Sequence, residues 1–267
     1  MDRGMTADPV WAPLFEGYAP AREWLAGNPP RRRDPDLQRP RQRHRPRHRA
    51  DVRDRHGRAL PGRRRGFGRR PVPDVVGSPD LSFHLLQNLM DDGFDLTVFQ
   101  ELDVDHGFTV PLSVWTPDPG DAWPCPVVPL LVNVIQYPQP TAARCYALGK
   151  HWQGDRVVRG CADRRHPRHR RDVAPAGGRR AGGFINPEFD AMFLDAIEND
   201  PPEKLAALSR EDFIRQAGSE GIELIMWLVM RGAMNEQIRK VHSAYHVPAS
   251  NTAAGLALFD NRTAQPA

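Results

Sequence analysis

Two arginine-rich windows limit what this chain can fold into more than any other feature. The chain has 267 residues with 34 Arg and 3 Lys, and 17 of the Arg lie at positions 31–70 and nine at 156–180. Neither window shows the apolar periodicity of a helix or a strand, so we expect neither to supply a core element. The formal net charge of +4 comes from these windows, because acidic residues exceed basic ones elsewhere. The basic character is therefore local.

The rest of the sequence predicts an α/β fold with a central, mostly buried sheet flanked by helices. Residues 127–137 form an apolar run rich in Val and Ile, typical of a strand covered on both faces. LTVFQ (96–100) and FTVPLSVW (108–115) predict two more strands. Strands that alternate with helices indicate a buried sheet, and we expect one domain over 1–267 with disrupted segments at 31–70 and 156–180. Helical patterns cover 9–25, 78–93, 141–152, 187–199, 201–216 and 219–234.

The cysteines and the hydropathy predict a cytoplasmic protein. Cys125, Cys145 and Cys161 are lone cysteines without paired spacing, which argues against a disulfide framework and for a reducing compartment. We find no apolar run of membrane-spanning length and no signal-peptide core at the N-terminus. We therefore expect no membrane partner.

Glu223 is the first candidate site residue. It lies in the segment SEGIELIMWLVMRGAM (219–234), which has almost no polar face and therefore predicts a buried helix, with Ser219 as its N-cap. A buried carboxylate without a partner is costly, so it should be protonated, ion-paired or bound to a metal. Free N–H groups in the first helical turn could equally stabilise it. Both interpretations stay open on the residues alone.

Two polar loops supply the other candidates. The loop DVDHG (103–107) follows a predicted strand and carries His106, and sites often collect at the carboxyl ends of strands in α/β sheets. Its Asp residues could also simply form turns. In YHVPASNTA (245–253), Ser250 and Asn251 could contact a substrate, and a plain helix cap there is an equal alternative.

Several long motifs resemble a known enzyme family. DVDHGFTVPLSVW, WPCPVVPLLVNVIQYPQPT, AGGFINPEFD, GSEGIELIMWLVMRGA and YHVPASNTA occur in this order. Together they resemble the catalytic β subunits of protocatechuate 4,5-dioxygenases, which are class III extradiol ring-cleavage dioxygenases. Gallate dioxygenase is a close rival for the substrate. The similarity runs from about Val10 to Leu258, apart from the two windows.

The resemblance implies a mononuclear Fe(II) centre held by two His and one Glu, with open positions for a catechol-type aromatic acid and O₂. Glu223 matches the carboxylate ligand, and His106 matches a catalytic His near the O₂ or substrate region. Ser250 and Asn251 match the loop at the carboxylate end of the substrate. The family also pairs this subunit with a small α subunit.

The chain departs from the family at its histidines. The first iron-binding His belongs to a segment ahead of residue 1. The second follows a strand in a Tyr-Asn-Asp-His motif that should lie within 31–70 and is absent there. The catalytic base should follow a Gly-Thr-Gly-Gly-Met-Ser motif near 168–175 and is also absent. We therefore expect this chain to be inactive.

A shifted reading frame explains both windows. Permitted codons for RRRDPDLQRPR (31–41) encode Asp-Val-Ala-Ile-Leu-Ile-Tyr-Asn-Asp-His once one base is dropped. RRHPRHRRDVAPAGG (164–178) likewise encodes Val-Ala-Ile-Leu-Gly-Thr-Gly-Gly-Met-Ser-His-Gln-Leu-Ala. Each shifted frame restores the expected strand and motif in the expected place. We therefore interpret both windows as out-of-frame translation.

An Arg-rich nucleic-acid-binding protein is the alternative function. Arg clusters contact phosphate, and such binding weakens steeply with salt. However, the windows lack interleaved aromatic residues and any recognised nucleic-acid-binding fold. We therefore expect no nucleic-acid partner.

Overall fold

The chain divides into two compact units in the computed structural model, which describes residues 5–28, 76–99, 108, 126–134, 136–152, 184–249 and 252–261. One unit, called here the C-terminal unit, comprises Asp2–Ala19 and Leu131–Ala267. The other, the N-terminal unit, comprises Met1 and Pro20–Leu130.

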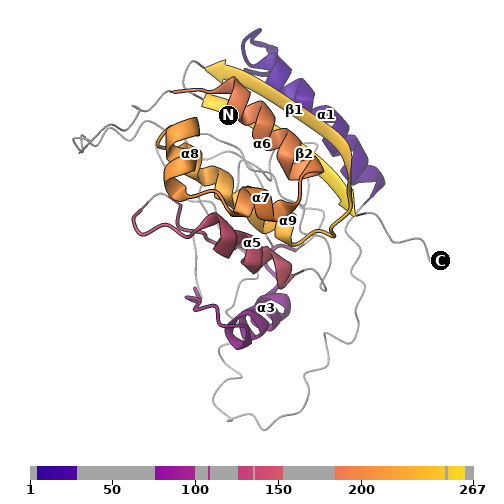
Figure 1. The fold of residues 1–267 in the computed structure, drawn as a ribbon. Helices are drawn as coiled ribbons and strands as arrows, with labels where there is room; N and C mark the ends of the chain where they lie inside the picture. The colour runs from indigo at the N-terminus through magenta and orange to yellow at the C-terminus, as the bar shows by residue number, and fades with distance from the viewer. Residues whose placement is uncertain are drawn as a thin grey trace, which may run out of the picture. The chain divides into compact units, whose positions relative to one another are not determined.

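The C-terminal unit combines short helices with one β-hairpin (Figure 1). Helix α1 crosses the boundary between the units, and its residues 12–19 belong to this one. In chain order the elements are η1 (Met5–Ala7), α1 (Ala12–Gly27), α5 (Ala142–Lys150), α6 (Pro187–Asn199), α7 (Pro202–Ala206), α8 (Arg210–Ala217), η3 (Gly221–Leu224), α9 (Ile225–Gly232), β1 (Ile238–Ala249) and β2 (Thr252–Asn261).

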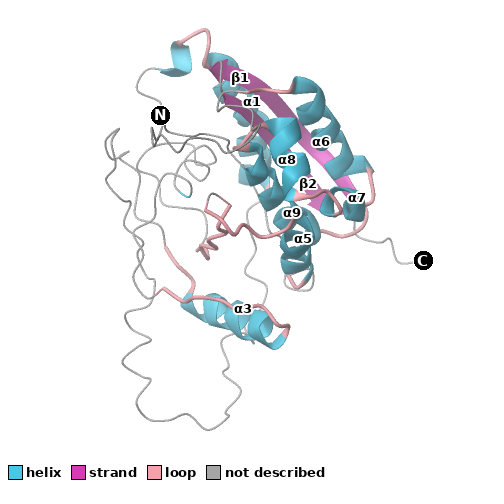
Figure 2. Cartoon of the chain, turned by 60° about the vertical axis from the view of Figure 1, so that its left-hand side comes forward, coloured by secondary structure: helices cyan, strands magenta, loops and turns pink. Residues whose placement is uncertain are grey.

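The hairpin lies between helices on its two faces (Figures 1 and 2). Strands β1 and β2 pair antiparallel from Ile238 opposite Asn261 to Ala249 opposite Thr252. Successive side chains of a strand point to opposite faces. His242 accordingly contacts Gly17 of α1, whereas Tyr245 contacts α6 on the other face.

Four aromatic rings form the centre of the helical core. Phe193 lies 6.2 Å from Phe213 and 6.1 Å from Trp227 between ring centroids, in edge-to-face geometry. Phe189 adds a further edge-to-face contact with Phe213 at 6.3 Å. Aromatic pairs favour this arrangement. The cluster therefore packs α6 against α8 and α9.

Helices α5 and α9 cross at two glycines. A Cβ atom at Gly149 would lie 2.0 Å from the carbonyl oxygen of Val229. A Cβ atom at Gly232 would lie 2.2 Å from the carbonyl oxygen of Tyr146. Only hydrogen side chains permit this backbone approach, so both positions require glycine.

The N-terminal unit contains α3 (Pro79–Asp91), which confirms the helix predicted from the sequence. Pro79 occupies the first turn, where its missing N–H costs nothing. Gly93, with φ of 82°, ends the segment. Gly77 and Val127 form an isolated parallel bridge in this unit, in which the Val127 N–H donates to the Val76 carbonyl at 2.9 Å.

The predicted central sheet is not seen among the described residues. Residues 96–99 and 126–134 form no regular strand beyond the bridge at Val127, so the strands predicted there are wrong within the described positions. Parallel sheets are usually buried on both faces, and each strand needs at least one neighbour to pair with. The strand-like sequences expected as neighbours are replaced in both windows by Arg-rich sequence. The sequence patterns also missed β1 and β2.

The predicted helices agree with the structure better than the predicted strands do. Helix α6 begins and ends at the residues predicted, and Thr141 caps α5 through its side chain, which accepts the Arg144 N–H at 3.2 Å. The predicted helix over 201–216 is split into α7 and α8. Ser209 interrupts it because its side chain forms a capping box with Asp212.

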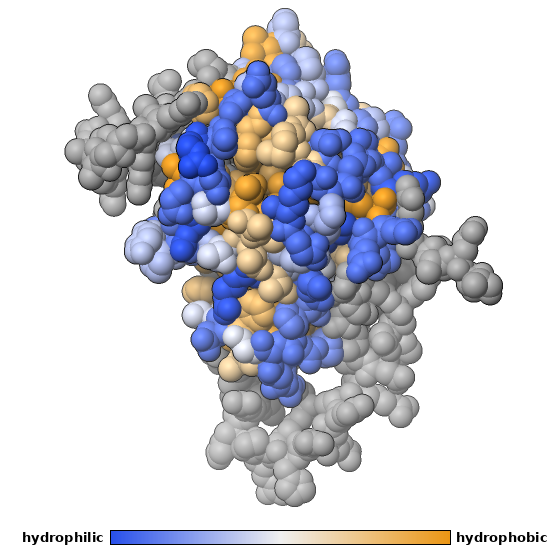
Figure 3. All heavy atoms as spheres, in the orientation of Figure 1, coloured by the Kyte–Doolittle hydropathy of each residue, from blue (hydrophilic) through white to orange (hydrophobic). Residues whose placement is uncertain are grey.

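The surface of the described residues is mainly hydrophilic, as expected for a folded chain. On the face in Figure 3, hydrophilic side chains predominate among the described residues, with hydrophobic ones in narrow bands between them. None of the helices in the described part of the chain is long and apolar enough to cross a membrane.

Candidate functional site

Glu223 lies in the short helix η3 and not in one continuous helix. The segment 219–234 breaks into η3 and α9, and Ser219 caps neither of them. Glu223 is half-buried, between Ile222 and Leu224, which are 3 % and 5 % exposed. Glu223 is therefore less buried than its apolar neighbours. The tight turns of η3 leave one edge of this residue near solvent.

Two glycines fix the turn that precedes Glu223. Gly218 has φ of 82°, a conformation that side chains rarely adopt. A Cβ atom at Gly221 would lie 2.3 Å from Cβ of Ala217 and 3.1 Å from the carbonyl oxygen of Phe213. Phe213 itself is fully buried in the aromatic core. Glu223 is thus held by a turn packed directly on the core.

Helix α6 anchors both this turn and the hairpin. The side-chain oxygen of Asn186 caps α6, while its Nδ2 donates to the Gln216 carbonyl at the end of α8, at 3.0 Å. On the hairpin side, the Tyr245 hydroxyl donates to Oδ2 of Asp190 at 2.9 Å. The positions of η3 and β1 are therefore set by one helix.

The pair of Asp190 and Tyr245 was missed by sequence reasoning. Asp190 is only 6 % exposed, which is unusual for a carboxylate. The available signal was its spacing, because position 190 shares a helix face with the buried Phe193 and Ile197. A carboxylate on an apolar face indicates a hydrogen-bond partner, and the Tyr245 hydroxyl supplies one.

The remaining predicted site residues lie outside the described part of the chain. His106, Ser250 and Asn251 are among the positions that the structure leaves undescribed. Ala249 pairs with Thr252, so β1 and β2 are connected through positions 250 and 251. The predicted proximity of Glu223 to His106 and to this connection stays a prediction.

Two histidines on β1 are structural. Nε2 of His242 lies 2.7 Å from the Gly17 carbonyl, and Nε2 of His246 lies 2.7 Å from the Val10 carbonyl. Pro20 lies within α1 and has no N–H to donate to the carbonyl of Glu16, the residue before Gly17. The His242 ring bonds the helix at that place. Both rings therefore fasten the start of α1 to the hairpin.

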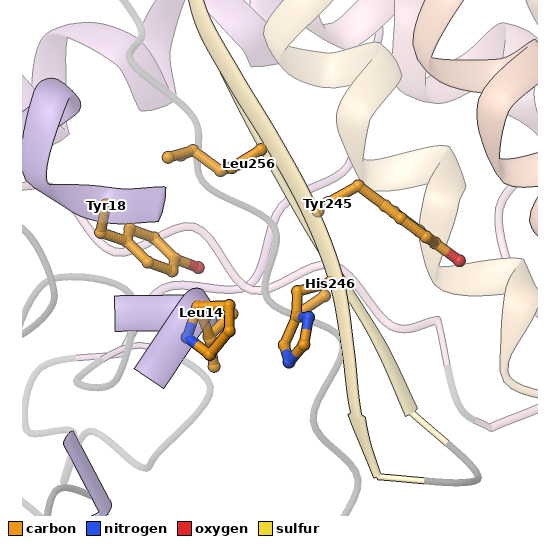
Figure 4. Close-up of a pocket in the computed structure, with 9 residues that line it drawn as sticks. Leu14, Tyr18, Tyr245, His246 and Leu256 are labelled. Atoms are coloured by element: carbon orange, nitrogen blue, oxygen red, sulfur yellow. The ribbon is translucent and has the colours of Figure 1, made fainter. Parts of the chain in front are cut away.

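A shallow hollow beside these histidines is too small to be a substrate site. Leu14, Tyr18, His246 and Leu256 line it, and Tyr245 projects away from them (Figure 4). Its cavity volume is only about 10 Å³. Ligand pockets usually span roughly 300–1,000 Å³.

A buried arginine near the end of α9 donates hydrogen bonds to backbone carbonyls. Arg231 is 2 % exposed. It donates to the carbonyls of Ile197, Asn235 and Glu236 at 3.1, 2.9 and 2.8 Å. Burial lowers the pKa of Arg231, and the nearby Tyr146 and acidic groups oppose that shift. The guanidinium is occupied with backbone carbonyls, so its role is structural.

The described residues do not by themselves form a metal centre. Among them, no group of three or more His, Cys, Asp or Glu side chains could hold a metal ion. Cys145 is no candidate nucleophile either, because burial raises the pKa of its thiol to about 11. A metal ion bound at Glu223 would therefore need further ligands from outside the described residues.

The chain belongs to an aromatic ring-opening dioxygenase family. Residues 1–256 match the model of the catalytic LigB subunit of aromatic ring-opening dioxygenase. This match confirms the class inferred from the sequence motifs.

Relatives within the family carry dioxygenase names. The chain is 36 % identical over 208 residues to gallate dioxygenase of Pseudomonas putida, across 76 % of this chain and 59 % of that protein. It is 26 % identical over 221 residues to 2,3-dihydroxyphenylpropionate/2,3-dihydroxicinnamic acid 1,2-dioxygenase of Mycolicibacterium vanbaalenii, across 67 % of this chain and 69 % of that protein. The chain thus spans less than two thirds of the gallate dioxygenase.

Proposed function

We propose that this chain derives from an extradiol ring-cleavage dioxygenase that opens a catechol-type aromatic acid with O₂. The family match over residues 1–256 carries the proposal. The name of one relative, gallate dioxygenase, favours a hydroxylated benzoic acid with neighbouring hydroxyls, of the gallate or protocatechuate type. The dihydroxyphenylpropionate relatives are less similar, so a longer side chain on the ring is less favoured.

Glu223 is the proposed carboxylate ligand of a non-haem Fe(II). When bound, such an ion supplies open positions for a catechol and O₂. The described residues fit this role only in part, because Glu223 is half-buried on a fixed turn but has no second and third ligand among them. We therefore derive no reaction step through iron. His106 is proposed to act near O₂, and Ser250 and Asn251 to bind the carboxylate of the substrate.

We further propose that this particular chain lacks activity. The chain carries neither the motif for a second iron-binding His nor the motif for the catalytic base, and permitted codons for 31–41 and 164–178 can encode both in a shifted frame. Without an imidazole from the first window, a carboxylate alone would bind Fe(II) weakly. A small α subunit and a cytoplasmic location complete the proposal, the first from the family resemblance and the second from the lone cysteines.

Iron binding and oxygen uptake test this function. We compare the chain as encoded with a restored version, whose two windows are returned to the shifted frame and whose N-terminus carries an added segment that supplies the first iron-binding His of the family. Both proteins are studied by anaerobic Fe(II) titration, followed by O₂ consumption with gallate and protocatechuate. We expect iron binding and O₂ uptake only in the restored version. Glu223→Gln in that version should abolish tight iron binding, whereas the matched change Glu220→Gln should not. A restored protein that takes up no iron would contradict the proposal.

The nucleic-acid alternative has no support in the described residues, because both Arg windows lie outside them. Salt-dependent retention of the purified chain on DNA would favour it, and an iron titration separates the two functions.

A further inference from the structure

We infer that Asn186 is a positioning residue of the proposed site, because its side-chain amide caps two helices at once and thereby fixes the turn that carries Glu223. The inference rests on the proposed function, in which Glu223 is the carboxylate ligand, and it adds the residue that orients this ligand. Asn186 belongs to AGGFINPEFD (181–190), a motif of the family resemblance to which the proposed function assigns no role. The residues that carry the inference all lie in the C-terminal unit.

The side-chain oxygen of Asn186 caps the start of α6. It accepts the Phe189 N–H at 3.2 Å, and Pro187 follows in the first turn, where its missing N–H costs nothing. The cap satisfies one of the N–H groups that no carbonyl within the helix can reach. Phe189 and Phe193 are 7 % and 1 % exposed, so α6 itself is anchored in the aromatic core. Asn186 is therefore held on a rigid element.

The side-chain nitrogen of Asn186 caps the end of α8. Nδ2 donates to the Gln216 carbonyl at 3.0 Å. Gln216 lies in the last turn of α8, where carbonyls have no N–H partner within the helix. Gly218 then turns the chain towards η3, and a Cβ atom there would lie 3.6 Å from both Cβ and the carbonyl oxygen of Phe184. The segment that precedes α6 thus contacts the turn at two places.

Only an amide offers both bonds from one side chain. Asn carries an acceptor oxygen and a donor nitrogen, whereas an ionised Asp only accepts and Ser has a single hydroxyl. The turn between Gln216 and Glu223 has little spare room, because a Cβ atom at Gly221 would lie 2.3 Å from Cβ of Ala217. A shift of the Gln216 carbonyl should therefore move Glu223.

Tyr245 supplies a matched control on the same helix. Its hydroxyl donates to Oδ2 of Asp190 at 2.9 Å, so Tyr245→Phe also removes one hydrogen bond of α6, but on the side of the hairpin. Loosening of α6 as a whole would follow from either loss. Release of the Glu223 turn should follow only from the loss of the Asn186 donor.

Carbon-13 spectra of labelled glutamate carboxyls and amide exchange of the chain as encoded test the inference. Asn186→Asp and Asn186→Ser both keep an oxygen that can cap α6, but neither keeps the amide donor. In both variants we expect the Glu223 resonance, assigned by its loss in Glu223→Gln, to shift or broaden. Amide exchange within 219–225 should rise about two- to tenfold, as for the loss of one hydrogen bond. Tyr245→Phe should leave both readouts unchanged.

A changed Glu223 resonance and faster exchange in both Asn186 variants, with neither change in Tyr245→Phe, support the inference. An unchanged resonance or unchanged exchange in either folded Asn186 variant overturns it. An equal change in Tyr245→Phe also overturns it, because that result would show a general loosening of α6. Urea unfolding identifies a variant that does not fold, and the other variant then decides. The measurement uses no iron and no substrate, so its failure is distinct from failure of the proposed function.

Discussion

At the scale of single residues, the buried polar side chains stabilise the fold and are not candidates for chemistry. The buried carboxylate of Asp190 is satisfied by Tyr245, and the buried Arg231 by backbone carbonyls. Glu223 differs from both, because it is half-buried on a turn fixed by Gly218 and Gly221. The sequence could predict Glu223 as a candidate because it interrupts an apolar run. Asp190 is harder to find, since its partner lies 55 residues away.

Cys145 should resist alkylation in the folded chain. Its pKa of about 11 leaves only about one thiol in a thousand as thiolate at pH 8, and the side chain is 2 % exposed. We expect iodoacetamide to leave Cys145 unmodified at pH 8 and to modify it in urea, as measured by peptide mass spectrometry. Equal modification rates with and without urea would contradict the burial of this thiol.

At the scale of elements, most helices were predictable, whereas strand pairing was not, and the cap predicted at Ser219 is wrong. Thr141, Asn186 and Ser209 all accept backbone N–H groups at helix starts, as their residue types suggest. The strands predicted over 96–100 and 127–137 depended on partners elsewhere in the chain, which no local pattern guarantees. The hairpin was missed because bulges disturb the alternation of β1 and because β2 is apolar on both faces.

The capping box of α8 should make stability depend on pH. Hydrogen bonds from Ser209 hold the pKa of Asp212 below its ordinary value. The ionised carboxylate therefore stabilises the fold above the unfolded pKa, and this contribution is lost as the pH falls through the lower, folded pKa. Ser209→Ala should lower the free energy of unfolding by about 1 kcal/mol at pH 7.

Urea unfolding of both proteins from pH 7 to pH 2.5 measures this effect. The gap between the parent and Ser209→Ala should narrow at the acid end. A gap of constant size would show that Asp212 takes no part in the cap.

The crossing of α5 and α9 should not tolerate a methyl group. In Gly232→Ala the new Cβ would meet the backbone of Tyr146 and Lys150, at 2.2 and 3.0 Å. Because backbone atoms cannot rotate away, we expect a loss of about 1–3 kcal/mol in the free energy of unfolding. Gly27→Ala is the control, since no atom lies within 4 Å of its Cβ position. If both variants unfold at the same urea concentration, the close crossing is wrong.

At the scale of the whole molecule, the apolar core of the described residues lies outside the two Arg windows. The aromatic cluster and the buried strand β2 both come from segments outside the two Arg windows. Class membership could therefore be inferred from motif order alone. The central sheet is not seen among the described residues, and two of its expected strands fall in the Arg windows, which lie outside those residues.

Amide hydrogen exchange should be slowest in the buried segments of the C-terminal unit and faster in α3. Phe193, Ile197, Ile225, Leu228 and Leu256 are at most 1 % exposed, so their amides should exchange slowest. Helix α3 has one fully buried side chain, Leu89, and its amides should exchange faster. Hydrogen exchange followed by mass spectrometry measures both, and faster exchange in α9 than in α3 would contradict the described core.

The most direct test of the account is to sequence the gene and the protein across both windows. The account predicts small insertions or deletions that bracket 31–70 and 156–180, and a corrected frame that encodes Tyr-Asn-Asp-His and Gly-Thr-Gly-Gly-Met-Ser at these places. An uninterrupted gene, together with peptides that carry the Arg-rich sequence of 31–70 in the mature protein, would contradict it.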